Sequence, residues 1–214
     1  MLPAMKLILA SASPRRKQIL REAGMRHEIA RAKIDESPKR GETARAMTRR
    51  LARAKARAVA KTLDKKRSDA IVIGADTIVE IDGHLLGKPE SPKAARDMLR
   101  KLSGQTHRVV TSVAAIRLAD RAEKIATRST LVHFAPVTAR EIADYVATRE
   151  PLGKAGAYAI QGRGGRFIER IEGCYFNVVG LPLALLYRVL IDLGWQPAAL
   201  SHKGKARSRS RPRA

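Results

Sequence analysis

Cysteine is almost absent from this sequence: Cys174 is the only one among 214 residues, so no disulfide can form within the chain. This excludes a disulfide-stapled secreted scaffold and indicates a reducing compartment. Cys174 itself is expected to be a small buried residue and not a nucleophile, because no histidine that could activate it lies near it in the sequence. The histidines neither pair closely nor have cysteine neighbours, so no zinc site is predicted. These histidines are His27, His84, His107, His133 and His202.

Long hydrophobic runs are also missing. No apolar stretch approaches the ~18 residues that a membrane-spanning helix needs, which excludes a transmembrane protein. Near the N-terminus, the apolar stretch 7–10 is shorter than the ~7 to 15 residues of an export signal, and Arg15 and Arg16 follow closely. We therefore expect a cytoplasmic protein without a membrane partner. Aromatic residues make up only 4% of the chain, so platforms for stacking nucleic-acid bases are scarce.

Acidic residues are outnumbered, with 20 against 43 basic ones, which gives a net charge of +23. Such an excess favours polyanionic partners: nucleic acid, an anionic membrane surface or phosphorylated small molecules. Residues 201–214 carry six of the basic residues and no acid, and this composition predicts a disordered basic tail. The folded domain is expected to cover residues 1–200. Nucleic-acid binding through the tail is an alternative that nothing else in the sequence supports.

Apolar runs alternate with amphipathic segments, which predicts a mixed α/β protein with helices flanking a sheet. Strands are expected at residues 6–11, 70–74, 77–81, 84–86, 106–118, 124–134 and 166–171. Helices are expected at residues 14–24, 43–63, 91–104, 138–148 and 182–194. Asp82 and Gly83 predict a type I′ hairpin turn. Trp195 is expected to pack against the core after the last helix.

Charged residues occur where a strand ends or a helix begins, a common location for phosphate chemistry. Arg15 and Arg16 open the first helix, although the helix dipole disfavours cations there, so they are candidates for binding phosphate oxygens. The alternative is that Arg15 and Arg16 only form an exposed basic first turn of the helix. Asp76 is expected directly after a strand that ends at Gly74, where a carboxylate can hold Mg²⁺ or take a proton from water. A turn aspartate that caps its own backbone is the alternative.

Two further segments carry weaker signals. Lys88 lies between a glycine and a proline after the hairpin, and surface lysines are common. The Gly-rich segment 153–165 suggests a loop close to a ligand, in which the amide of Gln161 could read a base edge. No P-loop, dinucleotide-binding or nucleophile-elbow motif is present, which argues against those three chemistries.

Taken in order, seven stretches of the sequence resemble the Maf family of nucleoside triphosphate pyrophosphatases. They span residues 7 to about 193. The matching stretches are LASASPRR (9–16), RLARAKA (50–56), GADTIV (74–79), GKP (87–89), MLRKLSGQTH (98–107), KAGAYAIQG (154–162) and NVVGLPL (177–183).

The resemblance implies a mixed sheet with flanking helices, two lobes around a basic cleft, and a homodimer. It also implies hydrolysis of a nucleoside triphosphate between the α and β phosphates, with Mg²⁺ or a similar divalent ion such as Mn²⁺ or Co²⁺. This reaction depends on positioning a water and neutralising negative charge, so the arginines, the lysines and a metal are suited to it.

The resemblance also implies residue roles. Asp76 corresponds to the residue that activates the attacking water, directly or through the metal, and Glu36 corresponds to a second metal-binding acid. The phosphate-binding residues it implies are Ser11, Arg15, Arg16, Lys55 and Lys88.

Substrate choice follows from a narrower resemblance. The segment 154–162 is similar to the subgroup that acts on dTTP, UTP and modified pyrimidine triphosphates, in which Arg15, Thr77 and Gln161 correspond to specificity residues. Gly153 departs from that pattern, because an acid often precedes Lys154. Two alternatives stay open: the 7-methyl-GTP specificity of the sister subgroup, and a nucleic-acid-binding or septum-formation regulator with a secondary hydrolase site. The leading interpretation is a nucleotide-pool housecleaning enzyme.

Overall fold

The computed structural model describes residues 5–63 and 67–197, and the expected basic tail at 201–214 lies outside them. Seven strands form one mixed sheet in the order β2-β1-β3-β5-β6-β7, with β4 paired to β3. The strands β2, β1 and β3 are parallel, whereas the other pairs are antiparallel. This confirms the mixed α/β architecture with flanking helices.

The strands are β1 (Lys6–Leu9), β2 (His27–Ile29), β3 (Ala70–Ile81), β4 (His84–Leu86), β5 (Thr106–Arg117), β6 (Glu123–Phe134) and β7 (Ile168–Glu172). The α-helices are α1 (Pro14–Glu22), α2 (Ala44–Thr62), α3 (Pro92–Leu102), α4 (Ala139–Ala147), α5 (Tyr175–Val179) and α6 (Leu183–Asp192). Two short 3₁₀ helices are η2 (Ala155–Ala157) and η3 (Arg163–Phe167).

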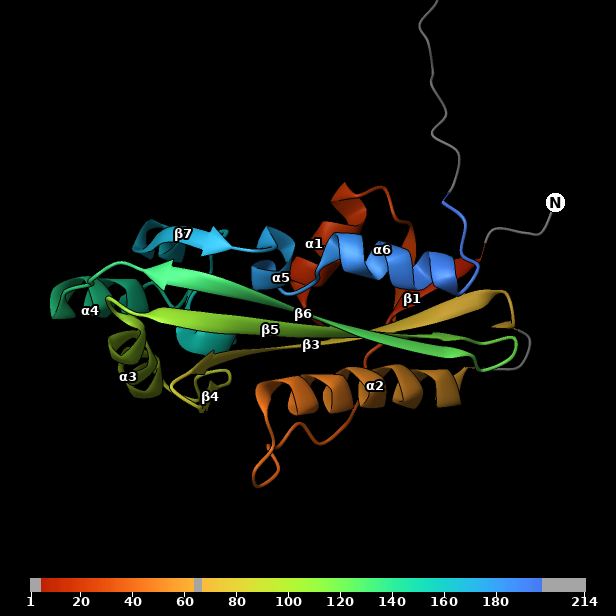
Figure 1. The fold of residues 1–214 in the computed structure, drawn as a ribbon, viewed down its shortest axis with the longest axis horizontal. Coiled ribbons are helices and arrows are strands. Elements are labelled where there is room, and N and C mark those ends of the chain that lie inside the picture. The colour runs from red at the N-terminus through yellow and green to blue at the C-terminus, as the bar shows by residue number, and fades with distance from the viewer. Residues whose placement is uncertain (1–4, 64–66, 198–214) are drawn as a thin grey trace, which may run out of the picture.

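Helices cover both faces of the half of the sheet that contains β1 (Figure 1). On one face, small residues of α2 such as Ala52 and Ala56 pack on Ile8 and Val72. On the other face, α1, α5 and α6 cover the alternate residues of the same strands. Because successive side chains of a strand point to opposite faces, β1 and β3 are buried on both sides. This explains their nearly continuous apolar sequences.

The other half of the sheet is covered by α3, α4 and η2, with a cluster of aromatic rings at its centre. His107 of β5 lies in this cluster, and its Nε2 is 2.8 Å from the hydroxyl oxygen of Tyr158. Its Nδ1 is buried without a hydrogen-bond partner among the described residues. Burial, and then the nearby His133, lower the pKa of His107 from 6.5 to about 4.

We expect His107 to make the fold acid-sensitive. Between pH 6.5 and 4 the unfolded chain binds a proton at this residue that the folded chain does not, so stability falls as the pH drops through that window. The loss by pH 4.5 should be roughly 2–3 kcal/mol from this group. Urea unfolding of wild type and His107→Gln at pH 7.5 and 4.5 measures it. An equal loss in both proteins would contradict the assignment.

The strand expected to end at Gly74 instead continues without interruption, and this prediction was wrong. Each residue from Ile71 to Glu80 is paired with β5, and Gly74 lies opposite Ala114. The glycine serves the packing of α2: a Cβ on Gly74 would lie 2.1 Å from the carbonyl oxygen of Ala52. Asp76 therefore lies in the middle of a twelve-residue strand and not in a turn. The alternative of an aspartate that caps its own turn is excluded with it.

Other predictions fared differently. The turn at Asp82 and Gly83 has φ values of 47° and 74°, as a type I′ turn requires. Trp195 is buried in the core beside α6, as expected. The last strand begins later than predicted, because residues 163–167 form η3. Cys174 is partly exposed at the start of α5, where a buried residue was expected.

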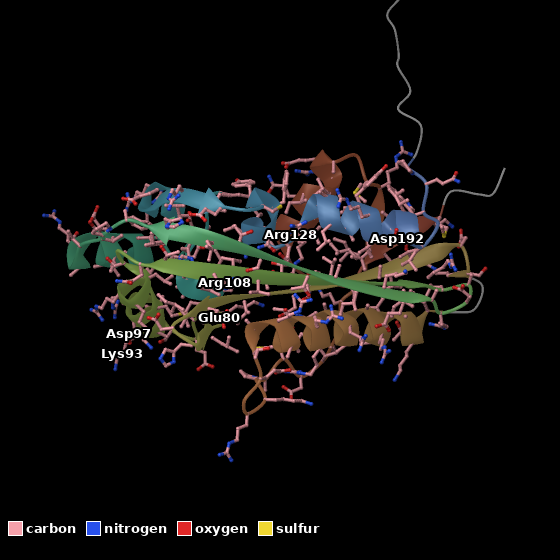
Figure 2. All side chains as sticks on the ribbon, in the orientation of Figure 1. Glu80, Lys93, Asp97, Arg108, Arg128 and Asp192 are labelled. Carbon is pink, nitrogen blue, oxygen red and sulfur yellow. The ribbon has the colours of Figure 1, made fainter. Side chains whose placement is uncertain are left out.

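Beyond the start of α2, the face of the sheet that this helix covers becomes accessible to solvent. Glu80 and Arg108 are cross-strand partners there, with Nε of Arg108 3.7 Å from Oε2 of Glu80 (Figure 2). Their side chains are 30% and 52% exposed, so the pair adds little to stability. Among the described residues, no helix is both long and apolar enough to cross a bilayer.

Candidate active site

The candidate site is centred on a stretch of β3 that has a strand on one side only. β1 pairs with β3 as far as Leu9 and Ile73, and β4 begins its pairing at Val79. Between these points, within the described chain, residues 74–78 pair with β5 alone. Asp76 and Thr77 lie in this open edge and point to opposite faces of the sheet. A ligand at this edge can therefore reach both faces.

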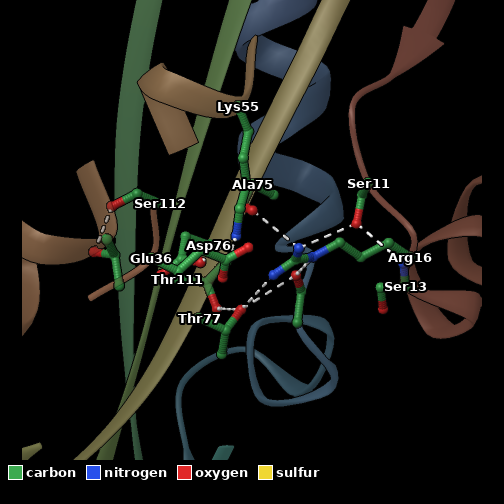
Figure 3. Close-up of polar contacts among 12 residues, drawn as sticks. Ser11, Ser13, Arg16, Glu36, Lys55, Ala75, Asp76, Thr77, Thr111 and Ser112 are labelled. Carbon is green, nitrogen blue, oxygen red and sulfur yellow. Dashed lines mark hydrogen bonds and ion pairs between the residues drawn. The ribbon is translucent and has the colours of Figure 1, made fainter. Parts of the chain in front are cut away.

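On the α2 face, two carboxylates converge on one ammonium group (Figure 3). Nζ of Lys55, from α2, lies 2.7 Å from Oδ1 of Asp76 and 2.9 Å from Oε2 of Glu36. The side chains of Lys55 and Asp76 are each 9% exposed, whereas that of Glu36 is 46% exposed. Lys55 reaches Asp76 because Gly74 lets α2 approach the strand closely. This brings together three of the predicted site residues.

Burial and the charges around Asp76 shift the pKa of its carboxyl group in opposite directions. Burial raises the pKa of its carboxyl group, and the negative charge of Glu36 adds to this, while Lys55 and Arg16 oppose it. The net effect is a pKa above the ordinary value of 3.8. Oδ2 of Asp76 accepts no hydrogen bond from the described residues, so it remains available to a water or a cation. A carboxylate with a raised pKa and a free oxygen is suited to accept a proton.

The same carboxylates fit a divalent cation. Mg²⁺ is commonly held by one or two carboxylates together with substrate phosphates and water. Asp76 and Glu36 already meet at one point, where Lys55 now supplies the positive charge. The described part of the chain contains no group of three or more histidine, cysteine or acidic side chains that could hold a metal ion, either at this site or elsewhere. The two acids are thus compatible with a metal that the substrate helps to hold.

On the opposite face, Arg16 is buried and held by the protein itself (Figure 3). Its Nε donates to the carbonyl of Gly180 at 2.8 Å, and its Nη1 donates to the carbonyl of Ala75 at 2.9 Å and to Oγ of Ser11 at 3.3 Å. Its Nη2 donates to Oγ1 of Thr77 at 3.0 Å. These contacts use four of its five N–H groups. One N–H remains for a ligand, so Arg16 chiefly joins α1, β3 and the loop before α6.

Arg15 is arranged differently, although it adjoins Arg16 in the sequence. It is half-buried and makes no hydrogen bond or ion pair with the described residues. Burial lowers the pKa of Arg15, and burial followed by the nearby Arg15 lowers that of Lys154. Nζ of Lys154 donates to the backbone carbonyl of Glu150, which orients it despite the unusual Gly153. Arg15 and Lys154 are thus two neighbouring cations with little negative charge from the protein to neutralise them, which favours an anionic or carbonyl-rich ligand.

The Gly-rich loop is anchored by Glu150, a residue that sequence reasoning missed. Its carboxylate accepts hydrogen bonds from the Tyr145 hydroxyl at 2.8 Å and from the backbone N–H groups of Arg163 and Gly164, each at 3.1 Å. Gly156 N donates to Gly87 O at 3.1 Å, which places the loop against the segment that carries Lys88. No local motif distinguishes Glu150 from other acids, so only the folded loop identifies it.

Like Arg15, two further predicted site residues make no side-chain hydrogen bond within the described chain. Lys88 and Gln161 are exposed, and neither makes a hydrogen bond with the described chain. A surface hollow of about 420 Å³ lies elsewhere, between the β3–β4 hairpin and the end of α3, and contains none of the predicted site residues.

A second set of residues missed by the sequence lies beneath Thr77. Thr111 is its partner in β5, and their Oγ1 atoms are 2.9 Å apart. Thr111 Oγ1 also donates to the backbone carbonyl of Asn177 at 3.1 Å. Thr111 and Asn177 are completely buried. The only sequence signal was the motif 177–183, and strand register was needed to place Thr111 beside Thr77.

Comparisons with known proteins find a family and relatives that match most of the chain. A family model described as "Maf-like protein" matches residues 6–193. A protein of Moorella thermoacetica named "dTTP/UTP pyrophosphatase" is 50% identical over 189 residues, covering 88% of this chain and 95% of the relative. Proteins with the same name from Pelotomaculum thermopropionicum and an Anaeromyxobacter species are 47% and 49% identical. They cover 89% and 90% of this chain and 97% and 93% of the relatives.

Proposed function

The chain belongs to the Maf family, and we propose that it hydrolyses dTTP and UTP to the monophosphate and pyrophosphate. The observation that carries this proposal is the cluster of Asp76, Lys55 and Glu36 at the open edge of β3. It combines a base and a cation in one site, which hydrolysis of a phosphoanhydride requires. The relatives named "dTTP/UTP pyrophosphatase" support the substrate.

In this proposal Asp76 accepts the proton of the attacking water through its free Oδ2. The water oxygen forms a bond to phosphorus, the bridging P–O bond between the α and β phosphates breaks, and pyrophosphate leaves. Lys55 holds Oδ1 of Asp76 at 2.7 Å and so fixes the orientation of the carboxylate. Because a base must be ionised, activity should fall as the pH drops through the raised pKa of Asp76.

Glu36 and Asp76 are the residues that would hold a divalent cation, Mg²⁺ or a similar ion such as Mn²⁺ or Co²⁺. When bound, such an ion neutralises phosphate charge that develops during the reaction. Glu36 is the more exposed of the two acids, and it lies on the segment between β2 and α2. Glu36 would therefore supply the exposed carboxylate of such a site, and Asp76 the buried one.

Phosphate binding is assigned to Ser11, Arg15, Lys55 and Lys88, with Arg16 contributing its one remaining N–H. Arg15 is the strongest of these assignments, because none of its N–H groups is used by the described residues. Lys88 is exposed in the segment that contacts η2, so it can reach a ligand at the open edge. The cations thus come from both faces of β3, as a chain of phosphates that crosses this edge would need.

Base recognition is assigned to Arg15, Thr77 and Gln161. Thr77 and Arg15 lie on the face of the sheet opposite Asp76, and the loop that carries Gln161 packs against β3 on that face, where Gly156 contacts Val79. The relatives favour a pyrimidine over the 7-methyl-GTP alternative, because their names specify dTTP and UTP. The homodimer, the cytoplasmic location and the binding of nucleic acid by the tail remain predictions.

Pyrophosphate release from a panel of triphosphates tests the proposal. With Mg²⁺ present, dTTP and UTP should be hydrolysed with the highest kcat/KM among dTTP, UTP, CTP, dCTP, GTP, 7-methyl-GTP and ATP. Omission of the metal with a chelator present should abolish release. Release from 7-methyl-GTP alone would contradict the substrate, and release from none would contradict the reaction.

A further inference from the structure

The hydroxyl groups of Thr77 and Thr111 belong to a hydrogen-bond chain whose direction is fixed. A backbone carbonyl can only accept, so the 3.1 Å contact between Thr111 Oγ1 and the carbonyl of Asn177 uses the one hydroxyl proton of Thr111. Thr111 must then accept in its 2.9 Å contact with Thr77. The hydroxyl proton of Thr77 is therefore committed to Thr111.

Arg16 restricts Thr77 further. Its Nη2 can only donate, so the 3.0 Å contact occupies one of the two lone pairs on Oγ1 of Thr77. The carbonyl of Gly180 is a poor alternative acceptor, because its oxygen lies 3.4 Å from Oγ1 of Thr77, longer than an ordinary O–H···O hydrogen bond and longer than the 2.9 Å contact with Thr111. Thr77 is left with one free lone pair and no free proton. Toward a ligand, its hydroxyl acts as an acceptor only.

We propose that Thr111 is a positioning residue for base specificity: it keeps the hydroxyl of Thr77 an acceptor, so that the site selects a base with an N–H donor and disfavours one with an acceptor there. This inference rests on the proposed function. Thr111 is completely buried and cannot touch the substrate itself, whereas Thr77 is half-buried at the open edge. In this proposal Thr77 contacts the base, and Thr111 sets the selectivity through its hydrogen bond with Thr77.

Pyrimidine bases differ in hydrogen-bonding character at ring atom N3. Uracil and thymine carry a hydrogen on N3, which donates, whereas N3 of cytosine has a lone pair, which accepts. A hydroxyl that can only accept forms a hydrogen bond with N3–H of uracil or thymine. With cytosine, its lone pair faces the lone pair of N3, and no hydrogen bond forms. A freely rotating threonine would discriminate less, because its hydroxyl could donate to cytosine as easily as accept from uracil.

The ratio of kcat/KM for UTP to that for CTP tests this inference. Thr111→Val removes the hydroxyl at nearly constant shape and releases the proton of Thr77, so the ratio should fall about tenfold, the effect of one hydrogen bond. Thr111→Ser keeps the hydroxyl and should retain the wild-type ratio. Because both substrates are measured on the same preparation, the ratio is independent of the fraction of enzyme that is folded.

The outcomes separate the two proposals. If wild type releases pyrophosphate from neither UTP nor dTTP, the proposed function fails. If wild type hydrolyses UTP and CTP equally well, or if Thr111→Val leaves the ratio unchanged while UTP is still hydrolysed, the role of Thr111 fails, whereas the hydrolysis of UTP to the monophosphate and pyrophosphate stands. As a further arm, 3-methyl-UTP lacks the N3 hydrogen and should be a poorer substrate than UTP for wild type. An equal kcat/KM for the two would also overturn the inference.

Discussion

Replacement of Asp76 by asparagine is expected to reduce pyrophosphate release from dTTP by about 1,000-fold. The amide cannot accept a proton from water, and it is a weaker ligand for a divalent cation. Folding should be largely preserved, because the amide oxygen can accept the hydrogen bond from Lys55, and Lys55 keeps Glu36 at 2.9 Å. We expect the free energy of unfolding to change by less than about 2 kcal/mol.

Steady-state rates and urea unfolding on the same preparation test this prediction. A matched control is Asp97→Asn, which removes an exposed carboxylate from α3 that pairs only with Arg100 in the described structure (Figure 2). Its rate and stability should equal those of wild type. Retention of more than a tenth of the wild-type rate by Asp76→Asn would contradict the role of Asp76 as base.

The second large effect is expected for Gly74→Ala. The added Cβ would lie 2.1 Å from the carbonyl oxygen of Ala52 and 2.7 Å from the backbone nitrogen of Ala56. Both are backbone atoms of α2, so no side-chain rotation can relieve the clash, and the helix must move away from β3. We expect a loss of about 3 kcal/mol or more in the free energy of unfolding. Because Lys55 lies on α2, activity should also fall in the molecules that remain folded.

Gly87→Ala is the matched control for this substitution. A Cβ on Gly87 would have Cδ1 of Ile78 as its nearest neighbour, at 4.0 Å, and its φ lies outside the left-handed region. The control should change the free energy of unfolding by less than about 1 kcal/mol. If Gly74→Ala were as stable as Gly87→Ala, Gly74 would not be the residue that sets the distance between helix and strand.

The sequence by itself predicted most of the long helices and strands and, through its resemblance to a family, the candidate site residues. Apolar periodicity predicted α2 and the long strands β5 and β6 close to their observed bounds, because burial on a face leaves a regular pattern. Order and spacing of seven stretches predicted the family, and the chain belongs to it. The resemblance assigned site roles to Asp76, Lys55 and Glu36, but nothing in the sequence places the three side chains together.

The tertiary structure decided how these groups act together. Gly74 suggested a strand end from local propensity, but its role is to admit α2, and that role exists only when helix and strand are packed. Arg15 and Arg16 are adjacent and chemically identical. Nevertheless, the Arg16 side chain donates four hydrogen bonds within the described chain, whereas the Arg15 side chain donates none. The direction of the proton on Thr77 depends on Thr111 and Asn177, which are distant in sequence. Hydrogen-bond partners are set by proximity in the folded chain, and residues that are distant in the sequence come together only when the chain is folded.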